Sequence, residues 1–154
     1  MFFEVNCLPA DYGIAEERDL PVRIRDRVWF FLEEYSITDL KDYRRVLGTF
    51  GACLHFSRRL PMKVSGMTVP VGGGRLVAAV NGNYTGIRKN VAVWREVAHL
   101  LLGHCQGAAV VTLHSPVTDT DYTSCIFAME TVNALSRSPA PEQQRASGGF
   151  SRRA

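Results

Sequence analysis

The segment 90–104, NVAVWREVAHLLLGH, constrains the fold of this chain more than any other. Its apolar residues cover nearly every side of a helix, and a helix that is apolar all round belongs inside a domain. The segment also carries four ionisable side chains, Arg95, Glu96, His99 and His104. Buried ionisable groups need a metal, an opposite charge or a hydrogen-bond partner. We therefore predict a buried helix that begins near Asn90, ends at Gly103 or Gly107, and holds a polar site in the core.

The spacing of Glu96 and His99 is that of a zinc-protease helix with one residue changed. In H-E-x-x-H, two histidines four positions apart hold Zn²⁺ on one helix face, and the glutamate activates the metal-bound water. Residues 95–99 read REVAH, so Arg95 stands in place of the first histidine. Arginine stays protonated at physiological pH and cannot be a ligand. The motif indicates the ancestry of the helix more strongly than a present activity.

Composition is that of an ordinary single-domain globular protein. The chain has 154 residues, of which 46% are hydrophobic and 21% charged, enough to bury a real core. Four cysteines without a C-x-x-C pair fit a reducing cytosol better than a disulfide framework. No signal peptide and no apolar run of the ~20 residues that a membrane span requires is visible. We expect a cytoplasmic protein without a membrane partner.

Direct nucleic-acid binding is the least favoured function. The net charge is only +3, although residues 51–110 hold seven Lys/Arg against one Asp/Glu. Basic residues gathered in this way are more often a solvated surface than a binding face. The arginines of residues 58–95 have few aromatic residues among them, and no groove-reading helix accompanies them.

Periodicity along the rest of the chain predicts an α+β fold: a helical domain with a small, three-stranded, mostly antiparallel sheet. Residues 1–135 form the domain, and the polar tail 136–154 is expected to be disordered. Trp29, Phe30 and Phe31 are interpreted as core residues. The predicted elements are a helix from Pro21, a helix over 39–47, strands over 52–57, 67–71 and 76–81, a glycine hairpin turn at 72–74, a strand or loop wall over 108–113, and a last helix over 121–135 capped by Asp119 or Thr120.

Taken in order, these features resemble the ImmA/IrrE family of metallopeptidase-like, zincin-like domains. A strand ending in Asn81 and a basic linker precede the helix REVAHLLLGH, where the family has approximately HELGHLLLH. The family's closing helix has an acidic residue followed six and seven positions later by Phe-Ala, which Asp121 matches with Phe127 and Ala128. Glu130 also fits the glutamate two positions after Phe-Ala. The resemblance covers residues ~40–135.

The resemblance implies roles for three residues. His99 would be a zinc ligand, Glu96 the general base and Asp121 the acidic third ligand. The first metal ligand is missing because Arg95 occupies its position. Trp94 also replaces a small residue, and the Leu-Leu-x-Pro ending of the closing helix is only loosely present.

These departures leave two interpretations of the site. In the favoured one no cofactor is bound, and Arg95 supplies the positive charge of the metal and bridges Asp121 and Glu96. In the other the protein is an active zinc enzyme with a substituted ligand, and three residues are candidates: His114, His104 and Glu130. Of these, His114 is the best placed. His104 should lie roughly 140° around the helix from His99, and Glu130 should point off the helical face of Asp121.

Two functions follow from the resemblance. The first is a catalytically degenerate module of regulation or interaction, acting on a protein partner such as a DNA-binding helix-turn-helix repressor. The second is an active zinc metallopeptidase. Family members act in the cytoplasm, often on mobile elements or in stress responses.

Overall fold

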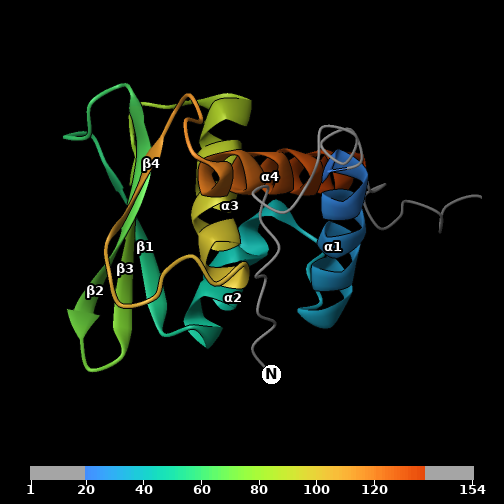
Figure 1. The fold of residues 1–154 in the computed structure, drawn as a ribbon, viewed down its shortest axis with the longest axis horizontal. Helices are drawn as coiled ribbons and strands as arrows, with labels where there is room; N and C mark the ends of the chain where they lie inside the picture. The colour runs from blue at the N-terminus through green and yellow to red at the C-terminus, as the bar shows by residue number, and fades with distance from the viewer. Residues whose placement is uncertain (1–19, 138–154) are drawn as a thin grey trace, which may run out of the picture.

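The computed structural model describes residues 20–137, which form an α+β fold, as expected. A four-stranded sheet lies on one side of helix α3, and helices α4 and α1 lie on the other (Figure 1). The elements in chain order are α1 (Leu20–Glu34), the 3-10 helix η2 (Leu40–Asp42), α2 (Tyr43–Thr49), β1 (Ala52–Ser57), β2 (Val64–Gly72), β3 (Arg75–Asn81), α3 (Gly86–Leu101), β4 (Val110–Leu113) and α4 (Asp119–Arg137).

The sheet has one more strand than we predicted, and it is mixed. Its order is β1-β3-β2-β4, with β1 parallel to β3 and the other two pairs antiparallel. The predicted hairpin is confirmed: β2 and β3 are joined at Gly73 and Gly74, both with positive φ. Strand β3 runs antiparallel to β2 and pairs with it along one edge. The other edge of β3 is therefore free to pair with β1, which runs in the same direction as β3. The fourth strand, β4, lies within the segment 108–113, which the sequence analysis left undecided between a strand and a loop wall.

Helix α3 lies at the centre of the molecule, between the sheet and α4 (Figure 1). It is buried from Ala92 to Leu101 without a break, as its apolar residues require. It begins at Gly86, four residues before the predicted N-cap Asn90, and the residue at the N-cap position, Thr85, makes no side-chain capping bond. The core around α3 includes Val28, Phe31, Val46, Leu47, Val80, Trp94, Val97, Ala98, Phe127 and Val132.

Helix α1 confirms the helix predicted from Pro21, but its aromatic residues do not all face the core. Phe31 is buried, whereas Trp29 is 57% and Phe30 48% exposed. Successive residues of a helix are about 100° apart, so three in a row cannot share one face. Helix α4 begins at Asp119 and continues to Arg137, two residues into the segment predicted to be disordered. The remaining part of that segment, 138–154, lies outside the described residues. Of the helices in residues 20–137, none has the length and apolar character that crossing a bilayer requires.

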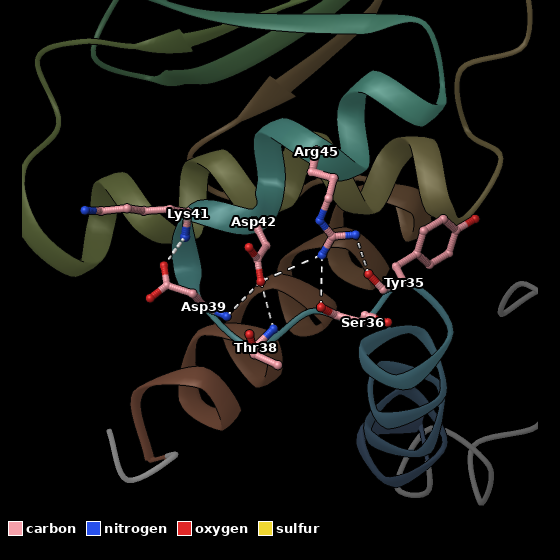
Figure 2. Close-up of polar contacts among 7 residues, drawn as sticks. All are labelled: Tyr35, Ser36, Thr38, Asp39, Lys41, Asp42 and Arg45. Carbon is pink, nitrogen blue, oxygen red and sulfur yellow. Dashed lines mark hydrogen bonds and ion pairs between the residues drawn. The ribbon is translucent and has the colours of Figure 1, made fainter. Parts of the chain in front are cut away.

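A network of polar contacts closes the turn between α1 and α2 (Figure 2). The side chain of Asp42 accepts hydrogen bonds from the backbone N–H groups of Thr38 (2.8 Å) and Asp39 (3.0 Å). The Asp39 side chain accepts one from the N–H of Lys41, which completes a capping box. Arg45 donates to the carbonyls of the two residues that follow α1, Tyr35 and Ser36. These bonds set the direction in which the chain enters α2.

Replacing Asp42 with alanine should destabilise this turn. Two backbone N–H groups lose their acceptor in Asp42→Ala, and loss of a cap of this kind costs about 1 kcal/mol. Urea unfolding of the two proteins measures the difference. Lys41→Ala, in the same 3-10 turn, leaves these bonds in place and is the control. Equal stabilities of native protein and Asp42→Ala would show that the cap contributes nothing.

Candidate functional site

The three ionisable residues in the middle of α3 are buried and lie next to the sheet. Arg95 is 2% exposed, and Glu96 and His99 are completely covered. Arg95 and Glu96 contact strand β2, and His99 contacts the chain that follows α3. The structure therefore places a polar cluster in the core, where the sequence predicts one.

Glu96 points at strand β2, which is built to receive it. Its Oε2 accepts a hydrogen bond of 2.7 Å from the Thr68 hydroxyl, while Oε1 has no partner. A Cβ atom at Gly66 would come within 2.6 Å of Oε1, so only glycine leaves room for the carboxyl group there. Burial raises the pKa of Glu96 to about 7, although the hydroxyls of Thr112 and Thr68 and the charge of Arg95 oppose the rise. The group can therefore hold or release a proton near neutral pH.

His99 forms a pair with His104, contrary to our prediction that the two face apart. Their Nδ1 atoms are 3.0 Å apart. The helix ends at Leu101, and Gly103, with φ 73°, turns the chain back so that the N–H of His104 bonds to the carbonyl of His99. This is a Schellman motif, in which the second residue after the C-cap Leu102 lies over the last turn of the helix. Our prediction was wrong because it continued helical geometry past Gly103.

Both rings of this pair are held in the neutral form. The pKa of His99 falls to about 3, through burial, the nearby His104 ring and the charge of Arg95. Burial also lowers the pKa of His104, against the opposing charge of Asp121. One Nδ1 therefore donates to the other, and each ring has an Nε2 atom with no partner.

Arg95 does not bridge Asp121 or Glu96, so this prediction was wrong. Nε and Nη2 of its guanidinium have no hydrogen-bond partner, and it forms no ion pair with either carboxylate. Nη1 of Arg95 instead makes two long contacts, to the Ser65 hydroxyl (3.5 Å) and the His114 carbonyl (3.4 Å). Glu96, one residue further along α3, faces another part of β2, about 100° around the helix.

Asp121 lies buried in the first turn of α4. Its backbone N–H bonds to the Thr118 hydroxyl, and its Oδ2 is 3.5 Å from the N–H of Val117. Thr118 therefore caps this helix, in place of the predicted Asp119 or Thr120. The charge of Asp121 raises the pKa values of Glu96 and His104, which places it in the same electrostatic environment.

The other two substitute ligands lie away from His99. Glu130 is paired with Arg25 of α1 at 3.2 Å. The His114 ring is exposed and packs edge-on against Tyr84, with 5.8 Å between ring centroids. Of the three candidates, His104 is the one that contacts His99.

The cluster leaves many buried polar atoms without a hydrogen bond, and such atoms are rare in folded proteins. Unpartnered atoms that concentrate in one place are typical of a site that binds something. They are Arg95 Nε and Nη2, Glu96 Oε1, His99 Nε2 and His104 Nε2.

Within residues 20–137 no three His, Cys, Asp or Glu side chains lie close enough together to hold a metal ion. The permanent charge of Arg95 lies one helical turn from His99 and opposes a second cation. Cys105 offers no thiolate either, since burial raises its pKa to about 12.

Comparison with known proteins found no similar protein. No protein-family model, no curated protein and no solved structure matches this chain.

The sheet residues of the cluster were missed by the sequence analysis. Ser65, Gly66 and Thr68 on β2 and Thr112 on β4 contact the ionisable groups, whereas our attention was on charged residues and histidines. One signal was present: a glycine inside a strand often marks a place where another group approaches closely.

Changing Glu96 to glutamine should alter how stability depends on pH. The folded protein keeps the Glu96 proton up to about pH 7, whereas the unfolded chain loses it near 4.5. Stability therefore falls as pH rises from about 4.5 to about 7, by an amount on the order of 3 kcal/mol. Glu96→Gln stays neutral, so it should gain stability relative to the native protein over this range.

Unfolding in urea at pH 4 and pH 8 measures this gain. His99 acts in the opposite direction, because its lowered pKa makes stability fall with acid. Comparing variant with native protein at each pH cancels that effect. Glu33→Gln removes the same charge from an exposed position and is the control. If Glu96→Gln gained the same stability at both pH values, Glu96 could not be a buried carboxyl that keeps its proton in the folded protein.

Proposed function

We propose that this protein has the metallopeptidase-like, zincin-like fold of the ImmA/IrrE family but works without catalysis. It would act in the cytoplasm as a module of regulation or interaction, on a protein partner such as a helix-turn-helix repressor. The observation that carries the proposal is the place of Arg95. It stands where the family has its first metal histidine, and it is buried beside Glu96 and one turn from His99.

Two further features support this relationship. Glu96 and His99 are both enclosed between α3 and its neighbours, as a catalytic base and a ligand would be. Asp121, the third residue that the resemblance implies, is buried on the adjoining helix and affects the pKa of Glu96. The burial of all three residues supports the comparison with a metal site that has lost its first ligand.

The charge of Arg95 is the reason to propose a loss of catalysis. A guanidinium cannot be deprotonated to become a ligand. At close range its repulsion of Zn²⁺ costs roughly several kcal/mol, even with strong screening. A site that loses a ligand and gains a positive charge should bind zinc weakly.

One observation favours the alternative, an active zinc metallopeptidase with a substituted ligand set. His104 lies against His99, and both rings are neutral, which is the form that binds metals. Together with Asp121 these two histidines would be the substituted set.

Zinc analysis of Arg95→His separates the two functions. This variant restores H-E-x-x-H, so it should bind about one equivalent of zinc, whereas the native protein should bind none. The matched control is Arg95→Met, which removes the charge without adding a ligand and should stay metal-free. In Arg95→His/His99→Ala the bound zinc should be lost again.

Two results would contradict the proposal. Stoichiometric zinc in native protein, lost in His99→Ala and in Asp121→Ala, would support the active enzyme. A folded Arg95→His that binds no zinc would show that the comparison of α3 with a metallopeptidase helix is wrong. A partner repressor, once found, should remain uncleaved when mixed with this protein; cleavage of the repressor would again favour the enzyme.

A further inference from the structure

Arg95 borders a cavity of about 220 Å³ between α3, α4 and the end of β4. Arg88 and the His114 ring also line it, and no acidic residue does. Burial and the charges of Arg88 and Arg95 lower the pKa of His114, so its ring adds no positive charge at neutral pH. Arg88 is exposed, with its guanidinium carbon 3.7 Å from the centroid of the Tyr84 ring, so cation–π contact holds this charge in position. The cavity therefore has an exposed basic group as well as the buried guanidinium.

One edge of the Arg95 guanidinium is covered from solvent and makes no hydrogen bond. Nη1 makes the two long contacts to Ser65 and His114, whereas Nε and Nη2 have no hydrogen-bond partner. Nε and Nη2 lie side by side on one edge of the planar group, and this pair of donors matches the two oxygens of a carboxylate. A buried cation with neither a counter-ion nor its hydrogen bonds is costly. An anion bound at this edge would supply both the counter-ion and the missing hydrogen bonds.

The rest of the cavity wall is mostly apolar. Val91 and Ala92 of α3 face Cys125 and Met129 of α4 across it. A free inorganic anion would leave this surface without contacts, whereas a carboxylate with an apolar body would cover it. An apolar cavity of about 150 Å³ is large enough for benzene, so this one has room for a ring or a branched chain.

We propose that this cavity binds a carboxylate carrying a small apolar body, with the carboxylate paired to the guanidinium of Arg95. The ligand is either a small free carboxylic acid or the C-terminal carboxylate of a peptide, which present the same chemistry. This binding depends on the contacts of Arg95 and not on the proposed loss of catalysis.

Calorimetry and thermal melting of the native protein, first treated with chelator, test the proposal. Benzoate represents a free acid and N-acetyl-leucine a peptide C-terminus. At about 100 times its dissociation constant, the acid that binds should raise the melting temperature by roughly 5–10 °C. Benzamide and N-acetyl-leucinamide, which have the same shapes without the charge, should give no shift.

Variants locate the binding. Arg95→Met replaces the guanidinium with an apolar side chain, so it should stay folded and bind the acid at least tenfold more weakly. Arg88→Gln should weaken binding to a lesser degree because Arg88 is exposed to solvent. Arg75→Gln, which removes one positive charge from the β2–β3 hairpin, should bind like the native protein.

Three results would overturn the proposal. The first is that neither acid binds the native protein. The second is that an amide binds as well as its acid, which would make the cavity merely apolar. The third is that Arg95→Met keeps native affinity. Zinc in the native protein would count against the proposed function but would leave these outcomes unchanged, so the two can fail separately.

Discussion

The hydrogen bond between Thr68 of β2 and Glu96 of α3 is the contact on which the rest of the site depends. It fixes the rotation of a helix whose apolar surface alone would permit several. With Glu96 held against Gly66 and Thr68, Arg95 is directed toward Ser65 and the carbonyl after β4. His99 is directed toward the turn at Gly103 for the same reason. One contact between helix and sheet thus orients all three ionisable groups.

A core of this kind is a poor way to obtain stability. Apolar side chains of similar size usually serve at least as well as buried charges. Here a carboxyl oxygen, two guanidinium nitrogens and two imidazole nitrogens are buried without partners. Natural proteins keep such groups mainly at functional sites. The positive charge of Arg95 opposes a metal at this place and also gives the protein a means of holding an anion. One residue therefore accounts for both the proposed loss of catalysis and the proposed binding of a carboxylate.

The sequence predicted the features that depend on neighbours along the chain. The bounds of β1, the glycine hairpin and the burial of residues 95–99 could all be obtained from local patterns. The parallel pairing of β1 with β3 could not, because hydrophobic pattern does not specify which edge of a strand is free. The direction of the Arg95 side chain could not be predicted either, since it depends on residues thirty positions away on β2. His104 is a different case: Gly103 was recognised as a stop, but the geometry beyond a Schellman turn was not applied.

The absence of a side chain at Gly66 links two positions that are thirty apart in the chain. A methyl group there would occupy the space of the Glu96 carboxyl and would also meet the carbonyl of Ala79. Strand and helix can therefore not change independently at these places. A chain that acquires a larger residue at position 66 must shorten the residue at 96 or move the helix away from the sheet. Among descendants of this sequence, the two residues should be kept together or exchanged together.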